Sequence, residues 1–151
     1  MKTLSNRENR REIRRRLAQL SPKDQARWGQ MSAHQIVCHL RDSYCVALGE
    51  KAISPATACW QRTLAKHIAL WVPVRWPKGY PTRPEVEQGK GGSVPSEFVL
   101  DWTALGRVFT RFCHNLAEPC TPHPVFGPMK AHDWWRWGYL HTDHHLRQFG
   151  R

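Results

Sequence analysis

Apolar residues recur at three- and four-residue spacing along several segments of the chain, and proline, glycine or serine stands at the joints between them. This period is typical of amphipathic α-helices. The predicted long helices cover residues 6–20, 32–48, 97–116 and 129–149, and a shorter helix is expected over residues 58–71. Neither an alternating strand pattern nor an internal repeat is found, so the pattern predicts an all-α protein.

Local signals place the ends of these helices. The pair Ser21-Pro22 ends the first helix, because proline disfavours a helical residue before it. Ser32 is well placed to cap the second helix, and Gly49 is a plausible stop. The buried faces are predicted from the same spacing to hold Ile13, Leu17, Leu20, Ile36, Leu40, Tyr44, Ala47, Leu48, Phe98, Leu105, Val108, Phe109 and Phe112.

Residues 72–95 interrupt the helical pattern. This stretch contains five prolines and the glycine cluster Gly89, Gly91 and Gly92, which we expect to exclude regular structure. It is longer than most connections in compact domains, which indicates a functional flap or a mobile crossover. The fold predicted is a four-helix bundle whose long crossover carries an extra short helix, in one domain over residues 1–151.

The chain is strongly basic, with a net charge of +11 at pH 7, and much of this charge lies between Asn6 and Arg16. Such a stretch could bind nucleic acid or an acidic partner. The pattern favours a solvated helix face instead, because Ile13 and Leu17 belong to an apolar stripe opposite the arginines and no aromatic residue stands between them to stack on bases. Nucleic acid is therefore not the expected partner, and a basic binding module without catalysis stays as an alternative.

The cysteines and the first residues bear on the compartment. Five cysteines form no CxxC pair, and the polar, arginine-rich start lacks the apolar segment of a signal peptide. The longest apolar run, near residues 67–74, is too short to cross a bilayer. We therefore expect a cytoplasmic protein with reduced thiols and no membrane partner.

Two histidines of the last predicted helix point to a metal. His141 and His145 are four residues apart, so their imidazoles stack on one helix face, which also carries Trp134, Gly138 and Gln148. His39 lies on the second helix at a position that turns toward the core. Three neutral imidazoles around one ion would leave coordination positions open for water or a substrate.

The other candidate ligands fit this arrangement less well. His144 points about a quarter-turn away from His145 and is expected at the surface or behind a ligand. Cys38 projects about 100° from His39, which favours a buried spectator thiol. The remaining histidines have no partner at useful spacing and are expected to be structural or exposed: His34, His67, His114, His123 and His132.

The segments MSAHQIVCHLRDS and HTDHHLRQF together resemble the DinB/YfiT-like metalloenzyme superfamily. The pieces WGQMSAHQIVCHL, HPVFGPM and HHLRQFG are similar to an uncharacterised family within it, and the resemblance runs roughly from Leu17 to Gly150. It implies a four-helix bundle in which one histidine of the second helix and an HxxxH pair of the last helix hold a divalent metal. By position these ligands are His39, His141 and His145. The commoner ending of the superfamily is HRGQ, and here Leu146 separates His145 from Arg147, which leaves the substrate open.

The resemblance also implies an activity. The best-known members of the wider group resemble thiol-dependent transferases that use low-molecular-weight thiols, and many others have no assigned activity. A thiol-dependent S-transferase is therefore expected, with metal-dependent hydrolysis as the alternative and a small molecule, such as a thiol, as partner. The resemblance favours a homodimer. Imidazole ligands suit zinc or nickel first and iron or copper as alternatives.

Side chains behind the ligands complete the predicted site. Asp42, one turn after His39, and Asp101 on the third long helix are candidates to accept a proton from a ligand imidazole, and His144 and Gln148 are further candidates. For both aspartates an ordinary helix-surface role competes. A purely structural ion that ties the last helix to the second is a third possibility.

Overall fold

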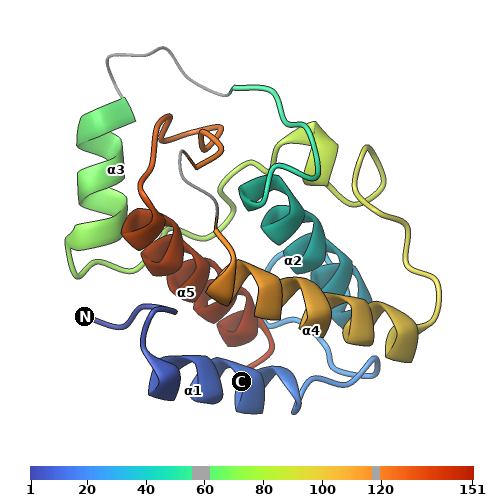
Figure 1. Ribbon diagram of the computed structural model, residues 1–151. Coiled ribbons are helices and arrows are strands. Elements are labelled where there is room, and N and C mark those ends of the chain that lie inside the picture. The colour runs from blue at the N-terminus through green and yellow to red at the C-terminus, as the bar shows by residue number, and fades with distance from the viewer. Residues whose placement is uncertain (56–61, 117–119) are drawn as a thin grey trace.

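A computed structural model describes residues 1–55, 62–116 and 120–151, and every regular element in these ranges is helical (Figure 1). In chain order the elements are α1 (Arg7–Leu17), α2 (Ala33–Ala47), α3 (Arg62–Trp71), the 3-10 helix η2 (Pro84–Val86), α4 (Phe98–His114) and α5 (Ala131–Gln148). The nearest feature to a strand in the described ranges is an isolated antiparallel bridge between His123 and Gly127. The predicted all-α class is confirmed. The first residues of the helix expected over 58–71 lie outside the described ranges.

Helix α2 has the ends that its sequence predicts. The Ser32 hydroxyl accepts from the backbone N–H of Gln35, and the Gln35 side chain accepts from the backbone N–H of Ser32, which completes a capping box. At the other end Gly49 follows the C-cap with φ of 76°, a left-handed conformation that glycine adopts without strain. Both ends of the helix that carries His39 are therefore fixed locally.

Helix α1 is shorter than predicted. The Asn6 side chain caps its start by accepting from the N–H groups of Glu8 and Asn9. The helix ends at Leu17 rather than at residue 20, because the chain turns there and Leu20 donates its N–H to the Leu17 carbonyl. Leu20 is still buried, so the turn brings the expected apolar residue to the core by another route.

The crossover after α3 is mostly irregular, as predicted, but the expectation that residues 72–95 hold no regular structure is wrong at η2. Pro84 occupies the first position of this short helix, where its missing N–H costs nothing and its fixed φ suits a helical turn. Proline thus begins an element here rather than excluding one. Helix α4 and helix α5 also end one or two residues inside their predicted bounds.

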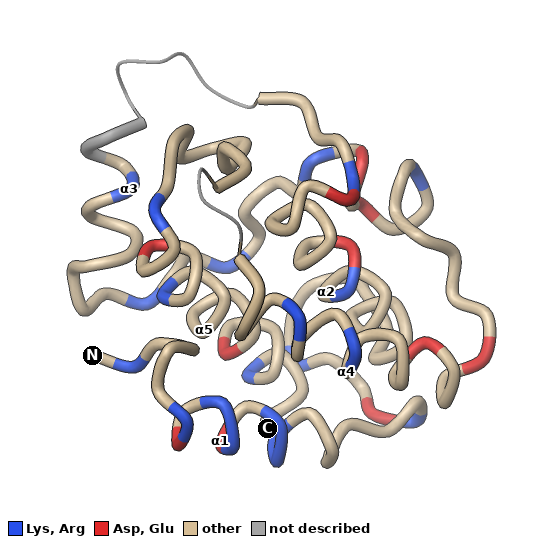
Figure 2. The backbone as a smooth tube through the Cα atoms, in the orientation of Figure 1, with Lys and Arg blue, Asp and Glu red and all other residues tan. Residues whose placement is uncertain are grey.

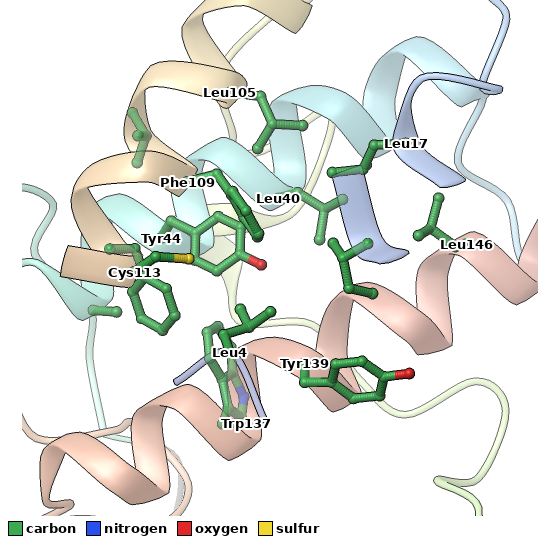
Figure 3. Packing of buried hydrophobic residues seen from close by; sticks show 14 of the residues in the cluster. Leu4, Leu17, Leu40, Tyr44, Leu105, Phe109, Cys113, Trp137, Tyr139 and Leu146 are labelled. Carbon is green, nitrogen blue, oxygen red and sulfur yellow. The ribbon is translucent and has the colours of Figure 1, made fainter. Parts of the chain in front are cut away.

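The core lies between α2, α4 and α5, with α1 closing one side (Figures 1 and 3). Tyr44 of α2 packs against Phe109 and Phe112 of α4, at ring-centroid distances of 5.6 and 4.7 Å. Gly138 allows α5 to approach this layer, since a Cβ there would lie 2.6 Å from the Phe112 ring. The predicted core positions are buried, except that Leu48 and Phe98 are only half-buried.

Polar side chains of α5 hold α3 and the first residues in place. Asp133 accepts from the indole N–H of Trp71 at 3.2 Å. The buried Arg136 donates to the Leu70 carbonyl and to the Lys2 carbonyl, both at 2.7 Å. These bonds fix the elements around α5, which carries two of the three candidate ligands.

Lys and Arg recur along α1 at the edge of the molecule (Figure 2). The described helices include none that is both long enough and apolar enough to cross a membrane. Of the five cysteines, Cys38, Cys45 and Cys113 are free thiols, and Cys59 lies outside the described residues.

Candidate metal centre

Helices α2 and α5 bring three imidazoles to one point. The Nε2 atom of His141 lies 3.3 Å from Nε2 of His39 and 3.1 Å from Nε2 of His145. One nitrogen from each of the three rings lies within 4.8 Å of the others. The predicted convergence of residues that are about a hundred positions apart in the sequence is therefore confirmed.

The helical geometry explains why the rings meet. His141 and His145 are one turn apart on α5, and His39 occupies the inward side of α2, which packs against α5. His39 and His145 are buried, with exposed fractions of 3% and 7%, and His141 is half-buried. The group therefore lies inside the protein rather than on its surface.

Hydrogen bonds fix the tautomers of two rings. Nδ1–H of His39 donates to the main-chain carbonyl of Val86 at 2.9 Å, since a carbonyl can only accept. Nδ1–H of His145 donates to Oε1 of Gln148 at 2.6 Å, and the Gln148 amide nitrogen in turn donates to the Trp28 carbonyl at 3.5 Å. Both rings therefore present an Nε2 lone pair to the centre of the group.

The two close Nε2 pairs would need two N–H donors, and the three rings can supply only one. His39 and His145 offer only lone pairs, so His141 can supply a single Nε2 proton and can satisfy one neighbour at a time. The other close nitrogen pair then has two lone pairs facing each other in a buried site, which is unfavourable. A cation at the centre would accept all three lone pairs.

The spacing of the nitrogens suits a transition-metal ion. With metal–nitrogen bonds of about 2.0–2.1 Å and tetrahedral angles, two imidazole nitrogens on one ion lie about 3.3 Å apart. The separations of 3.1 and 3.3 Å, which are those of two of the three nitrogen pairs, match this value. In the described part of the chain no fourth His, Cys, Asp or Glu joins this group, so a tetrahedral ion would keep one position open.

The three imidazoles are held in the form that binds metal. Burial lowers the pKa of His39, and it holds the pKa of His145 well below its ordinary value. Burial, followed by the neighbouring imidazoles, likewise holds the pKa of His141 well below its ordinary value. A proton is thus a poor substitute for a metal ion here, because protonation would place an imidazolium in a buried site.

Aromatic rings surround His141. Trp137, one turn earlier on α5, stacks on its ring at a centroid distance of 4.6 Å and an interplanar angle of 20°. Trp76 of the crossover lies 6.4 Å from it and 6.3 Å from His144. These rings exclude water from one side of the site. They also orient His141, whose Nδ1 forms no hydrogen bond with a described residue.

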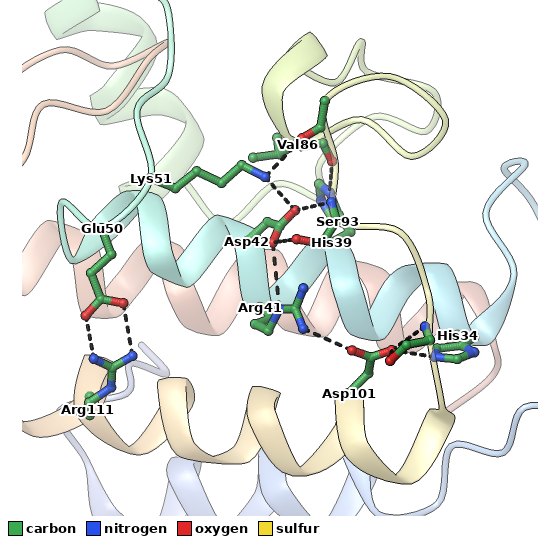
Figure 4. A network of polar contacts seen from close by, with 12 residues as sticks. His34, His39, Arg41, Asp42, Glu50, Lys51, Val86, Ser93, Asp101 and Arg111 are labelled. Atoms are coloured by element: carbon green, nitrogen blue, oxygen red, sulfur yellow. Dashed lines mark hydrogen bonds and ion pairs between the residues drawn. The ribbon is translucent and has the colours of Figure 1, made fainter.

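Asp42 is buried next to His39 along α2 but forms its hydrogen bonds elsewhere (Figure 4). Its carboxylate accepts from Lys51 Nζ at 2.8 Å, from the Ser93 N–H at 2.7 Å and from the Ser93 hydroxyl at 2.6 Å. Asp42 therefore ties the crossover to α2. Asp42 affects His39 indirectly, because the crossover that it holds also supplies the Val86 carbonyl, which accepts from His39.

Asp101 is also engaged away from the three histidines. It accepts from His34 at 2.9 Å, from Arg41 at 3.0 Å and from the Ser96 N–H at 2.8 Å (Figure 4). These bonds join the start of α4 to α2, and they give His34 a partner that sequence spacing did not reveal. Cys38 lies close enough to His34 and Asp101 to form a second compact group.

The second group differs from the first in its electrostatics. Burial raises the pKa of the Cys38 thiol to about 11, and Arg41 already neutralises the carboxylate of Asp101. A divalent cation would have to displace the hydrogen bond between His34 and Asp101, and it would lie beside the Arg41 guanidinium. The group is best described as a polar connection between α2 and α4, and the expectation that Cys38 is a buried thiol is confirmed.

The other two predicted supporting residues lie next to the ligands. Gln148 orients His145 directly, as described above. The His144 ring stands edge-on to that of His145 at 5.4 Å and lies 6.2 Å from Trp28, without a hydrogen bond to the three ligands. Of the remaining histidines, His123 is buried, and His67, His114 and His132 are exposed.

The Val86 carbonyl, Trp137 and Trp76 contribute to the site and were not predicted. The Val86 carbonyl is a main-chain group of a loop, and every residue type carries one, so no sequence signal identifies it. Trp137 lies one turn before His141, and this i, i+4 spacing on the same helix could have predicted the stacking.

No protein-family model, curated protein or solved structure matches this chain. The function is therefore inferred from the residues and their geometry.

Proposed function

We propose that this protein binds a divalent metal ion through Nε2 of His39, His141 and His145, and that it is a metal-dependent enzyme of the DinB/YfiT-like kind. In this proposal α1, α2, α4 and α5 are the four helices of the bundle, and α3 belongs to the crossover. The observation that carries the proposal is the convergence of three Nε2 atoms, two of them with tautomers fixed by buried acceptors.

The ligand set favours an enzyme over a structural ion. Structural zinc sites are usually closed by four protein ligands, whereas three are available among the described residues here. A bound divalent ion lowers the pKa of a coordinated thiol or water, which makes a nucleophile available near neutral pH. The residues of the chain keep the imidazoles neutral, orient them and exclude bulk water.

The two reactions proposed are thiol-dependent S-transfer and, as the alternative, hydrolysis. Zinc and nickel are the proposed ions, with iron and copper as further choices for an all-imidazole set. The position that three protein ligands would leave open on the ion could accept either a thiolate or a water. The reactions therefore differ in which small molecule enters the site rather than in the protein ligands.

Metal analysis of purified variants tests the site. Wild-type protein should contain a single tightly bound ion per chain, and His39→Ala, His141→Ala and His145→Ala should each lose it. His114→Ala is the matched control, because this histidine is exposed and distant in sequence from the ligands. Equal metal content in the control and in the three ligand variants, all folded by circular dichroism, would disprove the site.

Cobalt substitution separates the two reactions. If the protein is an S-transferase, adding cysteine or glutathione to the cobalt form should produce a thiolate-to-cobalt absorption band. A hydrolase should show no such band and should cleave activated esters with a rate that depends on the metal. Full metal loading with neither response would support the structural role instead.

A further inference from the structure

The arginines of α1 fall into two sets. One set is used within the fold: Arg10 donates to the carbonyls of Leu4 and Ser5, Arg14 donates to the Thr110 hydroxyl, and Arg16 pairs with Glu12 and Asp143. These contacts attach α1 to the first residues, to α4 and to α5. They account for half of the arginines of the helix.

The other set is Arg7, Arg11 and Arg15. All three are exposed, and none forms a hydrogen bond or ion pair with any described residue. They stand at positions i, i+4 and i+8, so they form a continuous row along α1 that extends over about 12 Å. The sequence alone does not distinguish this row from the arginines that the fold uses.

Acidic residues near α1 do little to neutralise the row. Glu12 pairs with Lys2 and Arg16, and Asp143 pairs with Arg16 and Arg147. Glu8, in the first turn, is the exposed acidic neighbour that remains. The row therefore keeps most of its positive charge on a protein whose net charge is already +11.

Contrary to the expectation from the sequence pattern, we infer that Arg7, Arg11 and Arg15 form a docking surface for the phosphate backbone of duplex nucleic acid. Phosphates follow one strand of a duplex about every 3.4 Å along its axis, so 12 Å of helix spans about three of them. Guanidinium groups bind phosphate through paired N–H donors, and the N-terminal end of α1 adds its dipole on the Arg7 side. The surface contacts the backbone and does not read bases.

The chemistry of α1 argues against the other polyanions. Proteins that bind single strands stack bases on aromatic side chains, and α1 has none. A helix that lies in a membrane surface presents an apolar face to lipid, whereas Ile13 and Leu17 face the protein core. This surface is separate from the histidine centre, so its role does not depend on the metal.

Binding of a short labelled DNA duplex, measured by fluorescence anisotropy at several salt concentrations, tests the inference. The variant Arg7→Gln/Arg11→Gln/Arg15→Gln is compared with Arg75→Gln/Lys90→Gln/Arg107→Gln, which removes the same charge from exposed positions elsewhere. Each phosphate contact contributes about 0.9 to the slope of log affinity against log salt, so the α1 variant should lose about 2.7 in slope. The control variant should keep nearly the wild-type slope. Adding a chelator should change the slope of neither variant.

Two results would overturn the inference. Equal losses in both variants would show that binding follows net charge and has no specific surface. Binding of the wild-type protein to vesicles of phosphatidylcholine and phosphatidylserine through the same arginines, without binding to the duplex, would assign the surface to membranes instead. Circular dichroism of each variant keeps unfolding from being read as lost binding.

Discussion

Replacing Gln148 by alanine would remove the acceptor that holds the His145 ring. The bond from His145 Nδ1–H to Gln148 Oε1 is 2.6 Å long and buried, and no other described residue accepts this proton. Loss of a partner behind a ligand typically weakens metal binding about 10- to 100-fold, which is about 1.4–2.7 kcal/mol. We expect a loss of this size, because the freed ring can rotate or change tautomer and withdraw its Nε2 lone pair.

Competition with a chelator of known affinity measures this loss, and urea unfolding of the metal-free protein measures stability separately. The unpaired Nδ1–H should also cost about 1–3 kcal/mol of stability. Gln148→Glu keeps an acceptor and should retain or raise the affinity, and Gln25→Ala, at an exposed glutamine, should change nothing. An unchanged metal affinity in folded Gln148→Ala would refute the claim that this bond orients a ligand.

Three further variants test the surroundings of the site. Asp42→Asn should loosen the Ser93 contacts of the crossover, so amide exchange in residues 84–93 should become faster. Metal affinity should fall, but less than after loss of a ligand. Unchanged exchange in residues 84–93 would contradict this. Burial lowers the pKa of His123 to about 3, so below pH 6.5 the unfolded chain binds a proton there that the folded chain does not, and this residue should lower stability by up to about 1.4 kcal/mol per pH unit. His123→Asn, assayed by urea unfolding, should remove this share of the slope and leave the share due to His39, His141 and His145. Gly29 has φ of +81°, and a Cβ added by Gly29→Ala would lie 2.7 Å from the Gln148 amide nitrogen. Chelator competition should therefore show weaker metal binding. Wild-type affinity would exclude an effect of residue 29 on the metal site through Gln148.

The helices could be predicted because each depends on neighbours in sequence. Helix α2 shows this, since its start needs only Ser32 and Gln35 and its end needs only Gly49. The proximity of His141 and His145 also follows from spacing within one helix. The end of α1 was predicted less accurately, because the helix stops at Leu17 and the turn that follows brings Leu20 to the core.

The partners of buried carboxylates could not be predicted in the same way. Asp42 and Asp101 were expected behind the ligands, and the structure places them against Ser93 and His34 instead. Spacing along a helix gives the direction of a side chain but not the polar group that an adjacent loop brings to it. That group depends on how the crossover folds, and its proline and glycine content does not determine this.

Two independent parts of the chain prepare the ligands. The crossover supplies the Val86 acceptor for His39 and is itself tied to α2 through Asp42, whereas His145 is oriented by Gln148 of its own helix. Among the described residues the crossover forms a hydrogen bond with His39 and only a ring contact, through Trp76, with His141, so movement of this segment would displace His39 more than the pair on α5. The His141–His145 pair is thus the fixed half of the proposed site, and access for a reactant is most easily controlled from the side of α2 and the crossover.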